Sequence, residues 1–224
     1  MSHIQAYLEK IKKHETERFE LKKFGEERFK GARESFVYSC KAICPPTKKY
    51  PLGWIDKHPE VTDKIVRYCI QSEKFDGDLS KGIILMGSTG VGKTVYLNAL
   101  SLMMGYSNQF RFKIYTGFEM ERVYQLDVSH SDVYPLDKAL KSKMFGMDDI
   151  GEEHASIKRY GTEINVGIDT LTQRHQLCVN KGYVTFATTN LNADMIAKKY
   201  GARIESRIHE MFNMIGVTGK DLRK

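Results

Sequence analysis

The amino-acid sequence predicts an α/β fold in which a parallel sheet is covered by helices on both faces. Five short apolar runs have the length and composition of buried strands, at residues 82–87, 111–116, 143–148, 183–188 and 213–217. Helical patterns separate these runs, as in the spacing of Ile164, Ile168 and Leu171. Strands that alternate with helices are typical of a parallel sheet, because each parallel connection needs a crossover.

The composition is ordinary for one large folded domain, or for one domain with an appendage. The 224 residues are 41% hydrophobic and 28% charged. The chain contains no apolar run of the ~18–20 residues that a membrane span needs, and its N-terminus lacks the apolar core of a signal peptide. We therefore expect a cytoplasmic protein. Cys40 and Cys44 have a spacing that zinc could use, but no second Cys/His pair follows, so we expect reduced thiols.

The first 50 residues are expected to form a basic helical arm that binds a partner, and residues 51–224 a separate domain. The arm holds 12 Lys and Arg against 7 Glu, which is +5 of the chain's net charge of +7. Ile4, Leu8 and Ile11 have helical spacing, and "CPPTKKYPLG" (44–53) is typical of a boundary. A basic arm suits nucleic acid or an acidic protein face, although a charged surface helix would give the same pattern.

A phosphate-binding loop is predicted at "GSTGVGKT", between the first strand and the following helix. Glycines let backbone N–H groups turn towards phosphates, and the positive end of the helix points at them. Lys93 would reach the β- and γ-phosphates, and the Thr94 hydroxyl would hold Mg²⁺. The expected nucleotide-binding residues are Gly87, Ser88, Thr89, Gly90, Val91, Gly92, Lys93 and Thr94.

Two adjacent carboxylates follow the apolar strand in "MFGMDDIGEE". Asp148 is expected to hold Mg²⁺ directly or through water, and Asp149 to act as general base on the attacking water. The alternative is an ordinary acidic loop. The spacing from Lys93 leaves room for an extra strand between the phosphate-loop strand and the Asp148 strand. ATP is favoured over GTP, because the nearest match to N-K-x-D is "NKGY", with Tyr183 in place of the aspartate.

Two further segments carry candidate catalytic groups. "VTFATTNL" ends a strand in polar residues, and Asn190, with Thr189 as second choice, could position the attacking water. "YGARIESRIHEM" places Arg203 and Arg207 on one face of a short helix, with Ile204, Ile208 and Met211 towards the core. On this segment alone, an ion pair between Arg207 and Glu210 explains the arginines equally well.

In this order, the phosphate loop, "DDIG", "TTNL" and "YGARIESRI" resemble an AAA+ ATPase, a phosphate-loop NTPase of the ASCE type. "DDIGEE", "TLTQRHQ" with Arg174, and the terminal "GKDLRK" resemble more narrowly the DnaC-like helicase loaders and IstB-like transposition ATPases, over residues 55–224. The resemblance implies a five-stranded parallel sheet without a C-terminal helical lid. It also implies that Arg207, or else Arg203, is an arginine finger that completes the neighbouring subunit's ATP site in a homo-oligomer. Asp149 stands where many relatives have Glu, so slow turnover is expected.

The resemblance favours an ATP- and Mg²⁺-dependent ATPase of DNA replication that assembles on single-stranded DNA and binds a replicative helicase. The alternative within the same group is a transposition regulator that binds duplex DNA and a transposase. A small-molecule kinase is disfavoured, because it would need a lid and an acceptor site after the phosphate loop. Aromatic residues among basic ones could stack on DNA bases, although about half of them should be core residues: Phe110, Phe112, Tyr115 and Phe118.

Overall fold

The computed structural model describes residues 18–45, 55, 58–108, 111–125, 135–154, 156–159, 162–219 and 221. The first half of the chain forms η1 Glu26–Arg28, α2 Phe29–Ile43, α3 Pro59–Cys69, β1 Gly82–Met86, α4 Lys93–Asn108, β2 Ile114–Thr116 and α5 Gly117–Gln125. The second half forms α6 Pro135–Leu140, β3 Met144–Ile150, β4 Ile157–Arg159, β5 Thr162–Ile164, α7 Val166–Lys181, β6 Val184–Thr189, α8 Ala193–Tyr200, α9 Ala202–Met211 and β7 Phe212–Gly216.

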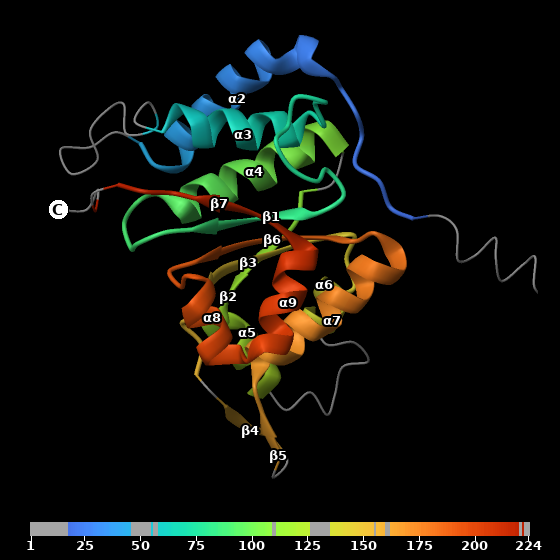
Figure 1. The fold of residues 1–224 in the computed structure, drawn as a ribbon, viewed down its shortest axis with the longest axis vertical. Helices are drawn as coiled ribbons and strands as arrows, with labels where there is room; N and C mark the ends of the chain where they lie inside the picture. The colour runs from blue at the N-terminus through green and yellow to red at the C-terminus, as the bar shows by residue number, and fades with distance from the viewer. Residues whose placement is uncertain are drawn as a thin grey trace, which may run out of the picture.

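The central sheet has five strands in the order β2-β3-β6-β1-β7, and every neighbouring pair is parallel. All five predicted strands are confirmed, although β2 begins only at Ile114, later than the apolar run suggested. A strand does lie between the phosphate-loop strand β1 and the Asp148 strand β3, but it is β6, which follows Asp148 in sequence; the strand that fills the interval between Lys93 and Asp148 is β2, at the edge of the sheet. A small antiparallel hairpin, β4–β5, projects from the opposite side of the molecule to α2 and α3 and was not predicted (Figure 1).

Helices cover both faces of the sheet, as the sequence predicted (Figure 1). On one face α2, α3 and α4 form a buried cluster with Ile83 and Leu85 of β1. On the other face α7, α8 and α9 form a second cluster that includes Ile84 of the same strand. Successive residues of a strand point to opposite faces, so a continuous apolar strand is buried twice.

Helix α2 belongs to the first of these clusters. It contacts α3 and α4, and Phe36 and Cys40 are fully buried there. The expected boundary between residues 50 and 51, and the Ile4, Leu8 and Ile11 pattern, lie outside the described residues. The division into arm and ATPase domain therefore stays a prediction, with α2 packed on the sheet domain.

Short polar caps set where the helices near the sheet edge begin. The side chain of Asn165 accepts a hydrogen bond from the Ile168 N–H at the start of α7, and Asn192 does the same for Met195 at the start of α8. The described residues after β7, 217–219 and 221, form no helix.

All four cysteines are free thiols, and the part of the chain that the structure describes contains no cluster of three or more His, Cys, Asp or Glu ligands. Among the helices described, none has the length and hydrophobicity to cross a membrane.

Candidate functional site

The predicted phosphate loop joins β1 to α4 at the carboxyl end of a central strand. Gly90 and Gly92 have φ angles of 85° and 94°, in the left-handed region where glycine is favoured. Gly87 has no room for a side chain, because a Cβ there would lie 2.1 Å from the Val217 carbonyl oxygen. Helix α4 begins at Lys93, so its positive end faces the loop. This backbone fits a phosphate group.

Lys93 is at the centre of a polar chain that connects three strand ends. Its side chain is largely buried, and Nζ donates hydrogen bonds to the carbonyl oxygens of Gly87 (2.8 Å) and Ser88 (2.9 Å). Nζ also donates to Oδ1 of Asn190 (2.6 Å). Nδ2 of Asn190 in turn donates to Oε1 of the exposed Glu152 (3.0 Å). The tip of β6 and the loop after β3 therefore meet at the phosphate loop.

Asp148 lies beside Thr94, as expected for two groups that share a cation. The Thr94 hydroxyl donates to Oδ1 of Asp148 (3.2 Å), and the Thr188 hydroxyl donates to the same oxygen (2.6 Å). Asp148 is 6% exposed. A hydroxyl and a carboxylate on this side of the loop are the hard oxygen ligands that Mg²⁺ prefers.

Asp149 has a different environment from its neighbour. Its φ angle is 54°, unusual for a residue other than glycine, and its N–H donates to the Thr188 hydroxyl (2.8 Å). Burial raises the pKa of the Asp149 carboxyl, and the negative charge of Asp148 raises it further, whereas Lys93 partly opposes them. A carboxylate with a raised pKa is better suited to accept a proton than an ordinary aspartate.

The two arginines lie on α9, whose other face is buried through Ile204, Ile208 and Met211 as predicted. Arg203 is exposed, and Nη1 of Arg207 donates to the Thr172 hydroxyl of α7 (2.7 Å). Glu210, the candidate ion-pair partner, accepts instead from His175 at 2.7 Å, with Arg207 only a lesser influence on its lowered pKa. The contact that Arg207 makes is thus to a neighbouring helix and not to the phosphate loop.

Three participants were not singled out by sequence reasoning. Thr188 orders both aspartates, Glu152 binds Asn190, and Asp221 lies against the phosphate loop. Oδ1 of Asp221 is 1.8 Å from the position that a Cβ at Gly90 would take. "TTNL" and "DDIGEE" contain the first two, but their contacts span 39 and 38 residues of sequence and so leave no local pattern. Thr189, the second choice for the water-positioning role, donates to the Ile150 carbonyl instead (2.6 Å).

Comparison with known proteins gives similarity of fold. No protein-family model matches the sequence, and no curated protein matches it. The solved DnaC helicase loader has a TM-score of 0.54 and 19% identity, over 81% of this chain and 98% of that chain. The solved DnaI has a TM-score of 0.55 and 22% identity, over 86% of this chain and 93% of that chain.

The replication initiator DnaA, solved with AMPPCP and single-stranded DNA, has a TM-score of 0.50 and 12% identity. The match covers 73% of this chain and 47% of DnaA. These likenesses and the strand order agree on one architecture. The chain has the fold of an AAA+ ATPase and is structurally similar to helicase loaders and initiators of DNA replication.

Proposed function

We propose that this chain binds and hydrolyses ATP between subunits of a homo-oligomer, and that it acts in DNA replication as a helicase-loader-like ATPase. One observation carries the enzymatic part of the proposal. Lys93, Thr94, Asp148, Asp149 and Asn190 converge at the carboxyl ends of three adjacent parallel strands, where α/β sheets bind their ligands.

Each of these groups has a separate role in the proposed reaction. Lys93 exchanges its contacts with the loop carbonyls and Asn190 for phosphate oxygens, and remains buried while doing so. Asp149 accepts a proton from the attacking water. Asn190, which lies against Lys93, orients that water relative to the terminal phosphate.

The Thr94 hydroxyl and the Asp148 carboxylate would hold Mg²⁺. Their hydrogen bond keeps two oxygen ligands together on the side of the loop that faces the phosphates. When bound, the ion supplies positive charge to the phosphate oxygens. Thr188 keeps Asp148 oriented and fixes the backbone of Asp149, so one hydroxyl serves both acids.

The arginines complete the site of a neighbouring subunit. A cation close to the transferred phosphoryl group stabilises the charge that develops there. Arg203 is exposed, and Arg207 is partly exposed beside Thr172, so both can be presented to a second copy. We assign the finger role to Arg207 and keep Arg203 as the second candidate.

The role in replication is supported by the structural likeness to the DnaC helicase loader and to DnaA bound to single-stranded DNA. We therefore favour single-stranded DNA and a replicative helicase as partners, in the cytoplasm, over duplex DNA and a transposase. The aromatic set contributes little to this choice. Phe112 stacks on Phe186 inside the core and Tyr115 stacks on Phe145, whereas Phe118 is 54% exposed and Phe110 lies outside the described residues.

A mixing experiment tests the shared site. Arg207→Ala keeps the phosphate loop and acids but lacks the finger, and Asp149→Asn keeps the finger but lacks the base. Each variant alone should bind ATP and lose ~10²-fold or more of its hydrolysis. Mixed together, they form an interface with intact acids on one side and an intact arginine on the other, so activity should return. Two variants that co-assemble and stay inactive would contradict the arginine finger.

The DNA partner is tested by fluorescence anisotropy with labelled oligonucleotides, with and without Mg·ATP. A helicase-loader-like protein should bind a single strand more tightly than the same sequence as a duplex, and ATP should strengthen that binding. The Lys93→Ala variant is the matched control, since its DNA binding should not respond to ATP. Tighter binding to the duplex would favour the transposition alternative.

A further inference from the structure

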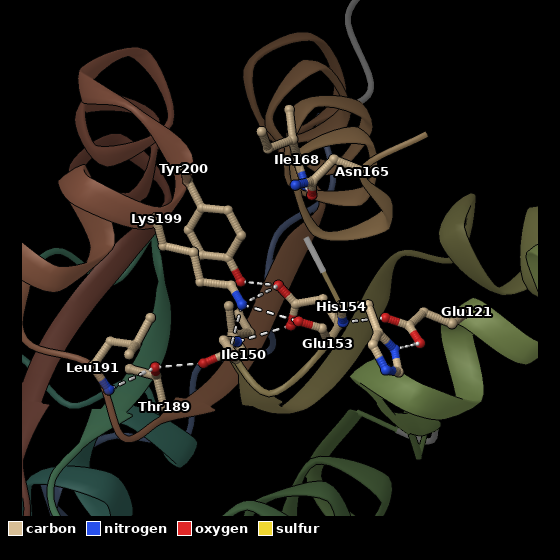
Figure 2. Close-up of polar contacts among 11 residues, drawn as sticks. Glu121, Ile150, Glu153, His154, Asn165, Ile168, Thr189, Leu191, Lys199 and Tyr200 are labelled. Atoms are coloured by element: carbon tan, nitrogen blue, oxygen red, sulfur yellow. Dashed lines mark hydrogen bonds and ion pairs between the residues drawn. The ribbon is translucent and has the colours of Figure 1, made fainter. Parts of the chain in front are cut away.

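A buried carboxylate holds the loop that follows the acidic pair. Glu153 is 3% exposed. Its Oε2 accepts a hydrogen bond from the Gly151 N–H (2.8 Å), and its Oε1 accepts one from the Tyr200 hydroxyl (Figure 2). Nζ of Lys199 lies 3.9 Å from the same Oε1. A charge with this little exposure is stable only when it is paired and hydrogen-bonded, so these contacts are required.

Two helices close around the Glu153 side chain. A Cβ at Gly167, in the first turn of α7, would lie 2.6 Å from Oε1, and a Cβ at Gly117, the first residue of α5, would lie 2.9 Å from the Glu153 Cβ. Both positions are at helix N-termini, whose partial positive charge favours a carboxylate. The loop after β3 is thus clamped against α5, α7 and α8 at once.

The partners of Glu153 stand next to the helix that carries the arginines. Lys199 and Tyr200 are the last two residues of α8, and α9 begins after Gly201, which has a φ angle of 85°. Lys199 Nζ donates to the carbonyl oxygens of Gly151 (2.8 Å) and Glu153 (2.9 Å) as well. Burial raises the pKa of Tyr200, as does its contact with Glu153, so the hydroxyl stays protonated and donates. Three hydrogen bonds therefore join the corner between α8 and α9 to the loop.

The other end of the loop is tied to the strand that carries Asn190. Thr189 donates to the Ile150 carbonyl (2.6 Å) and accepts from the Leu191 N–H (3.1 Å). The loop that follows Asp149 is therefore held at two points, at the end of β6 through Ile150 and at the corner before α9 through Glu153 (Figure 2). Glu153 follows Asp149 by four residues of the same short loop.

We propose that Glu153 is a positioning residue that couples the loop of Asp149 to helix α9 of the same chain, so that the acid site of one subunit and the arginine it offers to its neighbour are set together. This inference rests on the proposed function, because it presumes that α9 completes a neighbouring site. Within the described part of the chain Glu153 contacts neither the phosphate loop nor Arg203 or Arg207, and it acts through Gly151 on one side and Tyr200 and Lys199 on the other.

The chain offers a matched control on the same loop. Glu121 of α5 is 5% exposed and accepts from the His154 N–H and from His154 Nδ1 (2.8 Å), so it also anchors the loop (Figure 2). None of its contacts with described residues reaches the α8–α9 corner. Loss of Glu121 should loosen the loop without disturbing α9, whereas loss of Glu153 should disturb both.

The test uses the mixing assay with Glu153→Gln, Tyr200→Phe and Glu121→Gln, each full-length and paired with Asp149→Asn or Arg207→Ala. If Glu153 served only the acid site, Glu153→Gln would keep an intact finger, and Arg207→Ala would rescue it by supplying intact acids. If Glu153 served only α9, Glu153→Gln would keep intact acids, and Asp149→Asn would rescue it by supplying an intact finger. Coupling predicts that neither partner rescues Glu153→Gln. The ATP turnover of each mixture should be roughly 3- to 30-fold below that of the reference pair, Asp149→Asn mixed with Arg207→Ala. ATP affinity, measured by calorimetry, should be unchanged, and Glu121→Gln should be active with Arg207→Ala.

The outcomes are distinguishable. Rescue of Glu153→Gln by either partner, with an active reference pair, would overturn the coupling alone. The coupling would also be overturned if Glu121→Gln stayed inactive with both partners, because any change that loosens the loop would then abolish rescue. An inactive reference pair would overturn the proposed function and the coupling together. Tyr200→Phe removes a single hydroxyl and carries the test if Glu153→Gln does not fold.

Discussion

Replacing Arg174 by methionine should destabilise the fold without affecting nucleotide binding. Arg174 of α7 is fully buried, and its guanidinium donates to the carbonyl oxygens of Leu140 (2.6 Å), Ser142 (2.8 Å) and Val184 (2.8 Å) and to the Thr185 hydroxyl (2.9 Å). These acceptors lie at the end of α6, in the turn before β3 and at the amino end of β6. The phosphate loop is at the carboxyl ends, so the two regions can be perturbed separately.

The expected loss is about 2.5 kcal/mol. A hydrogen bond from a charged donor contributes ~2 kcal/mol, so four bonds contribute about 8 kcal/mol. Burial opposes the charge and lowers the pKa of Arg174 to about 10. Relative to an ordinary value of ~12.5, at ~1.4 kcal/mol for each pKa unit, this offsets about 3.5 kcal/mol. A buried methionine recovers about 2 kcal/mol through its apolar surface.

The free energy of unfolding would be measured by urea denaturation, with ATP affinity measured by calorimetry on the folded protein. A loss of this size corresponds to a melting temperature roughly 5–10 °C lower for a domain of this length. Arg203→Met is the matched control, because Arg203 is exposed, and it should change stability by no more than ~0.5 kcal/mol. An Arg174→Met variant as stable as Arg203→Met would refute this account of the four hydrogen bonds.

Three further predictions concern the nucleotide site. Lys93→Ala should abolish or greatly weaken Mg·ATP binding in calorimetry while circular dichroism remains that of the folded protein; unchanged affinity would contradict the phosphate loop. Asp149→Asn should stabilise the protein near neutral pH, because the folded state raises the pKa of this carboxyl above 3.8 and so disfavours its charge. The stabilisation should shrink as the pH falls towards 3.8. If the two free energies of unfolding, measured by urea denaturation, differed by the same amount at every pH, the prediction would be contradicted. Asp221→Asn should tighten ATP binding, since it removes a negative charge beside Gly90, and weaker binding would show that this carboxylate supports the loop instead.

The parallel sheet could be predicted from the sequence because its signals are local. Each central strand is a continuous apolar run, and burial on both faces leaves that pattern whatever the neighbours are. The β4–β5 hairpin left no such pattern, because each strand has only three residues and a single apolar pair, Ile157 and Ile164, stands next to the charged pair Lys158 and Glu163. The packing of α2 on α3 and α4 was equally hidden, since its apolar residues are interrupted by Lys30, Arg33, Glu34 and Lys41 and only one face is buried.

The candidate site divides in the same way. The carboxyl ends of parallel strands share one edge of a sheet, so Lys93, Asp148 and Asn190 could be expected to meet once their strands were identified. The partners of these residues could not be predicted. Glu152 reaches Asn190, and Glu153 reaches Tyr200, across 38 and 47 residues of sequence, and such contacts depend on how the helices pack.

The adjacent glutamates of "DDIGEE" illustrate why residue type alone was insufficient. Gly151, with a φ angle of 107°, turns the chain directly after the acidic strand. Beyond this turn Glu152 stays in solvent and reaches the Asn190 and Lys93 side of the loop, whereas Glu153 is directed between α5, α7 and α8. Two identical side chains in succession thus contact two different regions, the phosphate-loop side and the corner before α9. The backbone turn directs the two side chains apart. The single variants Glu152→Gln and Glu153→Gln should therefore separate contact with the nucleotide side from contact with the corner before α9.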